Sequence, residues 1–385
     1  MTSARRFLPL TTPGFDDDEI AEVSRCLDSG WVTQGPMVKR FEERFAAAHR
    51  VPHALATTSC TAALHLATMA LGVGPGDEVV VPAFTWVTSA HAVEYTGARV
   101  VFCDVDLTTY NLDPASLARA IGPRTRAVVV VHLFGLAAPL REVLELTAAK
   151  GIRIIEDAAC AVGSTYDGVP VGGTGDVGCF SFHPRKVITT GEGGMLTTRD
   201  PELAARLAVL RNHGAVPDPS HREPAPPWRM GRFEVLGYNL RLSDIQAAVG
   251  LAQMAKLARL LQERKERALR YDDLLSGIAD LALPAVPAPC GHTYQSYVVR
   301  LLEGGRERRN RVMETLQADG VQTRPGTHAV HRLGYYARRY GLQPDDFPAA
   351  CSAEDTTIAI PLFPGMTDAD QDRVAERLAA AMKLA

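Results

Sequence analysis

The chain has 385 residues, 46% of them hydrophobic and 22% charged, with a formal net charge of −3 at pH 7. This length predicts two or three domains, and the near-neutral charge argues against a nucleic-acid partner. No apolar run approaches the roughly 20 residues that span a bilayer, so no membrane partner is expected either. Seven cysteines without a CxxC pair predict reduced thiols and no metal site. With no secretory signal in the first residues, we expect a cytoplasmic protein.

Helical patterns alternate with β-branched runs over the first 160 residues. Helices are predicted over 16–29, about 37–48, 61–71, 86–95, 114–120 and 139–150. The strand-like runs between them are HALAT, EVVVPAF, RVVFCDV, AVVVVHLFG and IRIIEDAA. Continuous apolar strands separated by helices are typical of an α/β fold with a mostly parallel sheet covered on both faces. Such a sheet binds its ligand at the carboxyl ends of the strands.

The pattern changes after residue 160. Glycines cluster over 163–194, a helix is predicted over 201–212, and 215–232 indicates a loop rich in proline and charge. A long helix from 243 to about 275 is expected to link two domains. The runs YQSYVVRL and TIAIPLF, with helices over 306–318 and 368–383, predict a smaller α+β domain. We therefore expect a large domain over 1–250, and the linking helix with a small domain over 251–385.

The segment TTSCTAALHLA passes from a strand into small hydroxyl residues and then directly into a helix. Free N–H groups at a helix start form an anion site that suits a phosphate. Ordinary capping of the helix by Ser59 is the alternative interpretation.

Two charged residues are further candidates. Asp157 ends an apolar strand, where a carboxylate needs a partner, although a helix cap or a buried salt bridge would also explain it. Lys186 lies in the loop of FSFHPRKVITTGEGG, where most lysines are simply solvated. Trp86 follows the strand end VPAFTW. Phosphate site, aromatic ring, carboxylate, hydroxyl and lysine together are what a pyridoxal phosphate (PLP) enzyme requires.

The sequence also resembles the DegT/StrS family of sugar aminotransferases, which are fold-type I PLP enzymes. The resemblance extends over SGWVTQGPMVKRFEERFA, TTSCTAALHLA, GPGDEVVVPAFTWVTSAHAV, IIEDAA, FSFHPRKVITTGEGGML, LRNHG and GYNLRLSDIQAAVG. It implies a fold-type I architecture, with a large domain built on a mostly parallel sheet and a smaller C-terminal α+β domain.

The resemblance implies roles for individual residues. Lys186 would form the Schiff base with PLP and move protons during the reaction, and Asp157 would pair with the pyridine nitrogen. Asn239, in GYNLR, would reach the cofactor phosphate of a neighbouring subunit. A homodimer with active sites at the interface is therefore expected.

Further cofactor contacts follow from the same resemblance. Trp86 would stack on the ring, and Cys60, Thr61 and Ser181 would supply donors. The family usually has Gln or His three residues after the aspartate, near the ring oxygen, whereas this chain has Cys160. A thiol is a poor hydrogen-bond partner, so that contact is in doubt.

The expected reaction is amino transfer from glutamate or glutamine to a keto-sugar. Family members that remove a hydroxyl group replace the lysine with histidine, so Lys186 favours transamination. The TTGEGG motif resembles that of members acting at sugar C4, which implies a nucleotide-linked 4-keto-6-deoxysugar. A keto-cyclitol acceptor and a non-catalytic PLP-binding sensor or regulator are the alternatives.

Substrate contacts are expected from loops and the second domain. The segment TRPGTHAVHRLGYY is rich in donors, although it would also suit an ordinary solvated surface loop. Arg324 is suited to a nucleotide diphosphate or a donor carboxylate. The other candidates for substrate contact are Thr33, His183, His328 and His331.

Overall fold

A computed structural model describes residues 7–216 and 230–385, so most of the predicted loop over 215–232 lies outside the described residues. The helices are α1 (Asp17–Asp28), α2 (Pro36–His49), α3 (Cys60–Ala70), α4 (Thr88–Glu94), α5 (Pro114–Ala120), α6 (Leu140–Thr147), α7 (Pro201–Arg211), α8 (Asp244–Leu275), α9 (Gly305–Ala318), α10 (Gly334–Tyr340), α11 (Pro348–Thr356) and α12 (Asp368–Leu384). None of these helices has the length and apolar character needed to cross a membrane.

The longer strands are β1 (His53–Thr57), β2 (Glu78–Pro82), β4 (Arg99–Cys103), β5 (Thr125–Val131), β6 (Arg153–Asp157), β9 (Val177–Ser181), β10 (Gly194–Thr198), β14 (Tyr297–Leu301) and β16 (Thr357–Ile360). The two-residue strands are β3 (Phe84–Thr85), β7 (Thr165–Tyr166), β8 (Val169–Pro170), β11 (Ala215–Val216), β12 (Arg232–Phe233), β13 (Leu281–Ala282) and β15 (His328–Ala329).

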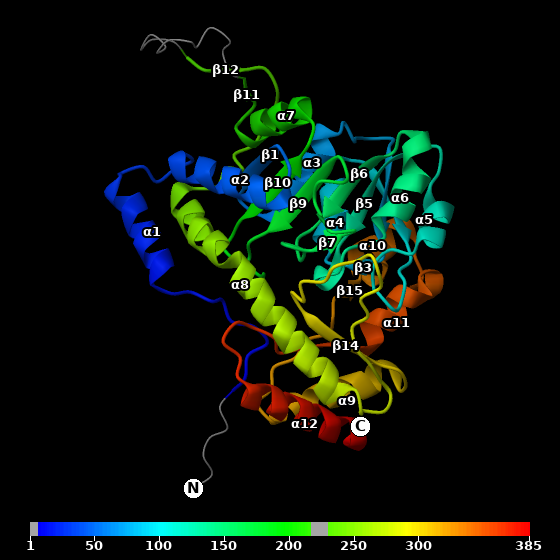
Figure 1. Ribbon diagram of the computed structural model, residues 1–385. Helices are drawn as coiled ribbons and strands as arrows, with labels where there is room; N and C mark the ends of the chain where they lie inside the picture. The colour runs from blue at the N-terminus through cyan, green and yellow to red at the C-terminus, as the bar shows by residue number, and fades with distance from the viewer. Residues whose placement is uncertain (1–6, 217–229) are drawn as a thin grey trace.

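A seven-stranded sheet in the order β1-β10-β9-β6-β5-β2-β4 forms the centre of the larger part (Figure 1). Strands β9, β6, β5, β2 and β4 run parallel, while β10 runs antiparallel to both of its neighbours. Because two antiparallel pairings restore the direction, β1 points the same way as β9. The mostly parallel sheet predicted from the sequence is therefore confirmed, with β10 as its one reversed strand.

The valine-rich strands are apolar at every position because both faces of the sheet are covered. Along β2, Val79 and Val81 belong to one hydrophobic cluster with α3 and α4, whereas Val80 points into a second cluster. Val129 and Val130 of β5 divide between the two clusters in the same way. Alternate side chains thus enter opposite cores, which is why no polar face interrupts the sequence.

Helix α8 begins where the sequence predicts, because Ser243 caps it and forms a capping box with Gln246. The next residue, Asp244, also serves a second helix. Its carboxylate accepts the N–H groups of Gly35, Met37 and Val38 at 2.8–3.1 Å, at the start of α2, whose N-cap glycine has no side chain to do so. The start of α8 therefore fixes the start of α2.

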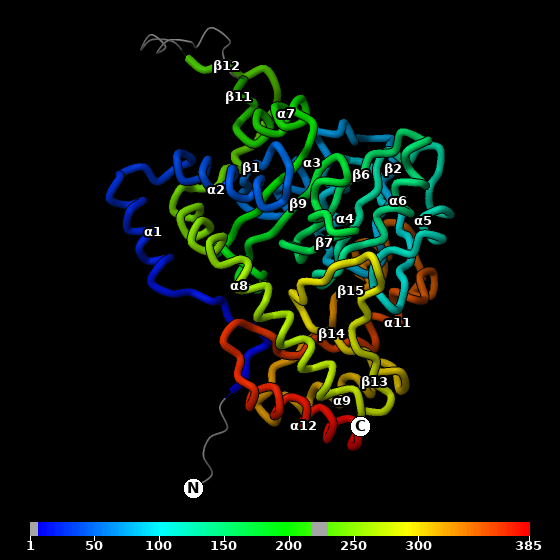
Figure 2. The backbone as a smooth tube through the Cα atoms, in the orientation of Figure 1, coloured from blue at the N-terminus to red at the C-terminus, as the bar shows by residue number. Residues whose placement is uncertain are grey.

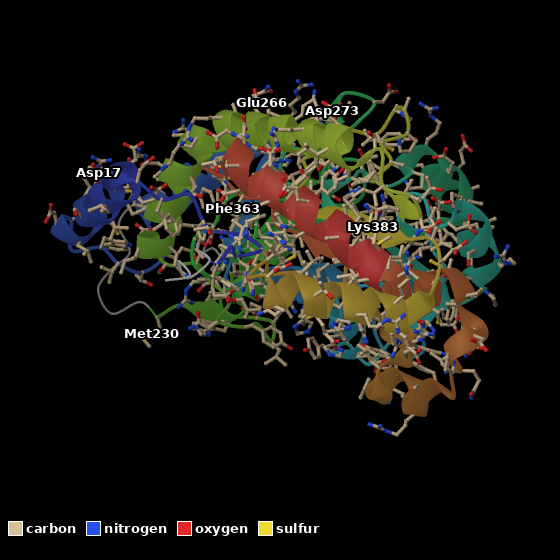
Figure 3. The ribbon with its side chains drawn as sticks, turned by 90° about the horizontal axis from the view of Figure 1, so that it is seen from below. Asp17, Met230, Glu266, Asp273, Phe363 and Lys383 are labelled. Carbon is tan, nitrogen blue, oxygen red and sulfur yellow. The ribbon has the colours of Figure 1, made fainter. Side chains whose placement is uncertain are left out.

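From the large part, α8 runs to a smaller one in which β13, β14 and β16 form an antiparallel sheet (Figure 1). Viewed from below, α12 lies between α8, which carries Glu266 and Asp273, and α9 (Figure 3). The α+β character predicted for this region is confirmed.

The two cores exchange segments, so no single boundary divides the chain. Leu8 pairs with Val321 and packs in the core of the smaller part. In Figure 2 the blue N-terminal segment runs up from the smaller part to α1. Conversely, Tyr336 of α10 and Ala350 of α11 pack in the core of the larger part. The division predicted at residue 250 falls within α8.

The segment around β15, for which a solvated surface loop was one interpretation of the sequence, forms a strand because it pairs with β3, far away in the chain. Strand β15 pairs antiparallel with β3, with His328 opposite Thr85 and Ala329 opposite Phe84. A two-residue strand has no periodicity of its own, so only the fold reveals it. This pairing brings the C-terminal region to the edge of the large sheet next to Trp86.

Candidate active site

A cavity of about 350 Å³ lies at the carboxyl edge of the sheet, where the larger and smaller parts meet. Ten residues singled out from the sequence line it: Cys60, Thr61, Trp86, Asp157, Cys160, Ser181, His183, Lys186, Arg324 and His328. They come from five separate stretches of chain, and the common direction of the strands brings the ends of most of these stretches together.

Asp157 ends β6 as a buried carboxylate, only 5% exposed. One oxygen accepts a 2.7 Å hydrogen bond from the hydroxyl of Ser89, and the other accepts the N–H of Ala159 at 3.2 Å. Burial raises the pKa of Asp157 above its usual value, and these neutral donors only partly oppose that rise. A cationic group in the cavity would therefore be stabilised beside it.

Ser89 is a site residue that the sequence reasoning missed. It is fully buried near the start of α4, and Thr85 lies 3.1 Å from its hydroxyl. The available signal was its position in TWVTSAH, directly after a strand end. Its 2.7 Å bond to Asp157 spans 68 residues of sequence, so local reasoning could not assign it.

The Lys186 amine donates to the thiol sulfur of Cys160, with 3.1 Å between Nζ and Sγ. Burial favours the neutral amine, but the neighbouring Cys160, Cys60 and Asp157 outweigh it and raise the pKa of Lys186. Cys160 stands where the family usually has a residue near the ring oxygen of the cofactor, and in this chain its sulfur contacts the amine of Lys186. The amine and the Asp157 carboxylate line one cavity without a direct ion pair.

We call the start of α3 the cradle, because its backbone amides would suit an anion. The Ser59 side chain caps the helix through the N–H of Ala62, and the first helical amides, those of Cys60 and Thr61, have no partner within the helix. A Cβ added to Gly194 would lie 2.5 Å from the carbonyl carbon of Ser59 and 2.7 Å from the amide nitrogen of Cys60. The absence of a side chain at Gly194, the last residue of the TTGEGG motif, therefore lets β10 pack directly against the start of α3.

Aromatic and basic side chains line the solvent-facing side of the cavity, which we call its upper part. The indole of Trp86 is 52% exposed, and its ring centre lies 5.5 Å from that of His328. His183 accepts the N–H of Arg185 through Nδ1 at 3.2 Å, and burial lowers its pKa. Arg324 is exposed, and its backbone exchanges two hydrogen bonds with that of Ala359 in β16.

Three sequence candidates do not line this cavity. Thr33 and Asn239 are exposed elsewhere on the chain; Asn239 lies beside Asn212, in a short antiparallel bridge. His331 is fully buried, donates from Nε2 to the carbonyl oxygen of Pro344 at 3.0 Å, and packs against the ring of Phe347. The expectation that His331 contacts substrate is wrong, because its side chain faces a core and has no exposed surface.

Comparison with known proteins identifies the family. The DegT/DnrJ/EryC1/StrS aminotransferase family matches residues 13–379. The chain belongs to this family. It is 40% identical to GDP-perosamine synthase of Caulobacter vibrioides over 369 residues, which cover 95% of this chain and 96% of that protein. It is 39% identical to the spore coat polysaccharide biosynthesis protein SpsC of Bacillus subtilis, over 96% of both chains.

Among solved structures, Spr1654 of Streptococcus pneumoniae superposes on this chain with a TM-score of 0.93 at 29% sequence identity. The superposition covers 98% of this chain and 99% of the Spr1654 chain. That protein has been solved in both a PLP form and a PMP form. The fold is therefore the fold-type I architecture expected from the sequence. The protein is a PLP-dependent aminotransferase.

The residues of this chain fit the cofactor. The buried Asp157 would face the pyridine nitrogen, the amides of Cys60 and Thr61 would hold the phosphate, and the Lys186 amine would reach the aldehyde carbon. When bound, PLP supplies an electron sink and carries the amino group between substrates. The two hydrogen bonds to this carboxylate come from neutral donors, Ser89 and Ala159, so a protonated ring nitrogen beside it would offset the cost of its burial.

Proposed function

We propose that this aminotransferase moves an amino group from glutamate or glutamine to a nucleotide-linked keto-sugar, a 4-keto-6-deoxysugar. The observation that carries the chemistry is the shared cavity of Lys186 and the buried Asp157. The sugar acceptor is supported by the two relatives, one named as a GDP-perosamine synthase and the other as a polysaccharide biosynthesis protein. A nucleotide-linked substrate and free thiols agree with a cytoplasmic location.

In this proposal Lys186 moves the protons of both half-reactions. Its Nζ takes a proton from the donor α-carbon, and the donor leaves as a 2-oxo acid. In the second half-reaction Nζ delivers a proton to the sugar carbon that gains the nitrogen, because that carbonyl carbon carries no hydrogen beforehand and its oxygen leaves as water. Cys160 holds the free amine inside the cavity at 3.1 Å, and Asp157 keeps a positive charge stable at its floor.

The roles of the remaining residues belong to the proposal. Trp86 stacks on the cofactor ring, which its exposed indole beside the cavity would allow, and Ser181 adds a donor. His183, His328 and Arg324 contact substrate from the upper part of the cavity.

We also propose a homodimer with active sites at the interface. Asn239 and Thr33 lie outside the cavity of their own chain, which suits contacts with a neighbouring subunit. Large apolar side chains are exposed on the segments next to them: Trp31, Val32, Phe233, Val235 and Leu236. Exposed apolar side chains on these two segments would favour burial against a partner.

A substrate panel tests the function. Wild-type protein loaded with PLP is incubated with glutamate or glutamine and with nucleotide-linked 3-keto-sugars, 4-keto-sugars or keto-cyclitols, and the amino product and 2-oxo acid are measured. We expect product from a 4-keto-6-deoxysugar nucleotide, and none with Lys186→Ala. Product from keto-cyclitols alone would replace the sugar assignment. The first half-reaction alone releases up to one 2-oxo acid per cofactor, so the decisive measurement is the amino product. No amino product from any acceptor in the panel would contradict the proposed reaction.

A further inference from the structure

Two arginines stand at the cavity without any acidic partner. Arg185 and Arg324 both line the cavity and are both exposed at it. Within residues 7–216 and 230–385, neither guanidinium forms a hydrogen bond or an ion pair. Other arginines of the same region are paired: Arg332 and Arg306 both reach Asp355. Without an acidic partner, both guanidinium groups keep their N–H donors available to an anionic ligand.

Each of the two arginines is held by its backbone. The carbonyl oxygen of Arg185 accepts the side-chain amide of Gln295 at 2.9 Å, and Gln295 also lines the cavity. The backbone of Arg324 is tied to Ala359 in both directions, at 3.2 and 2.7 Å. The two side chains therefore start from fixed points on opposite parts of the fold. Burial is the main cause of the lowered pKa of Arg185, and the positive charge of Arg324 is the second, so the two side chains lie close to each other.

The charge of the cavity lining favours an anion at this position. Its acidic residues are Asp157, buried at the floor, and Glu192, whereas Arg185, Lys186 and Arg324 are cationic. We propose that Arg185 and Arg324 form a clamp for the diphosphate of a nucleoside diphosphate, which deepens the proposed sugar-nucleotide function and rests on it. Guanidinium groups form paired hydrogen bonds with phosphate oxygens.

Position distinguishes a diphosphate from a donor carboxylate. The reacting carbon must lie near Nζ of Lys186, and the α-carboxylate of an amino acid is one bond from that carbon. The diphosphate of a nucleotide sugar is attached at the anomeric carbon and so lies several bonds away, toward the exposed arginines. Arg185, although next to Lys186 in sequence, is exposed while the lysine amine points to the interior sulfur of Cys160.

The test measures binding rather than turnover. The PLP-loaded protein is titrated calorimetrically with GDP, with guanosine and with glutarate, for wild type, Arg185→Gln, Arg324→Gln and the double variant. Each single change is expected to weaken GDP binding about tenfold, since a charge-assisted contact at an exposed site lies at the low end of its range. Guanosine binding should not change. Arg119→Gln, an exposed arginine of α5 away from the cavity, is the matched control.

Three results would overturn the clamp. The first is wild-type protein that binds GDP no more tightly than guanosine, and the second is a GDP affinity that is unchanged in the double variant. The third is a loss of glutarate affinity as large as the loss of GDP affinity, which would assign the two arginines to the donor carboxylate. The proposed reaction fails separately, through the substrate panel, because wild-type protein can bind GDP without aminating any keto-sugar. Thermal unfolding of each variant checks that the fold is kept.

Discussion

Replacing Gly194 with alanine tests whether the start of α3 is the phosphate cradle. The new Cβ would lie 2.5 Å from the carbonyl carbon of Ser59, 2.6 Å from its oxygen and 2.7 Å from the amide nitrogen of Cys60. All three are backbone atoms, so no side-chain rotation relieves the contact. Gly194 itself is paired in the sheet with Thr57 and Ser181. The strain must therefore move the cradle, the strand or both.

The size of the effect follows from these distances. Ordinary contact begins near 3.4 Å, so the cradle must move by about 0.9 Å from its present position. Overpacking of a well-packed site costs about 1–3 kcal/mol. If this strain is relieved where PLP binds, the cofactor should bind about 5- to 150-fold more weakly.

The assay titrates PLP into the apoprotein and follows the visible absorption of the bound cofactor. Gly74→Ala is the control, because a Cβ at Gly74 meets no atom within 4 Å and its backbone does not have a positive φ. We expect the control to bind PLP like wild type. PLP affinity of Gly194→Ala equal to wild type, in a protein with normal thermal unfolding, would refute the assignment of the cradle.

Three further changes test other parts of the site. Asp157→Asn should keep PLP bound but lower kcat by orders of magnitude. Because burial raises the pKa of Asp157, the apo variant should also melt at a higher temperature than the wild-type apoprotein at neutral pH, and this difference should disappear below about pH 3.9. Equal melting temperatures across the pH range would contradict a buried charge at Asp157. Ser89→Ala removes the 2.7 Å donor to that carboxylate and should lower kcat/KM by about tenfold or more with PLP still bound, and unchanged kinetics would assign Ser89 to packing alone. Mixing inactive Lys186→Ala with a severely impaired Asn239→Ala should restore part of the activity through mixed dimers, whereas subunit exchange without any gain would mean that each chain completes its own site.

Much of the fold can be read from the sequence because its causes are local. The helix over 114–120 was predicted with its observed bounds, since Asp113 caps it and proline occupies its first turn. The apolar strands and the start of α8 at Ser243 follow from the same kind of signal. Lys186 and Asp157 were singled out because each lies in a family motif that is contiguous in the sequence. Their meeting in one cavity follows from the parallel strands, whose ends share an edge.

Other features depended on contacts that no local pattern encodes. Ser89 reaches Asp157 across 68 residues, and the reversed strand β10 places Gly194 against the start of α3. His328 comes to the cavity through a two-residue strand, while His331, three positions later, turns into a core. Residue type and helical or strand periodicity determined which segments form and which groups carry charge. Only the tertiary packing decided which of those groups face the same cavity, because side-chain direction there depends on pairing between distant segments.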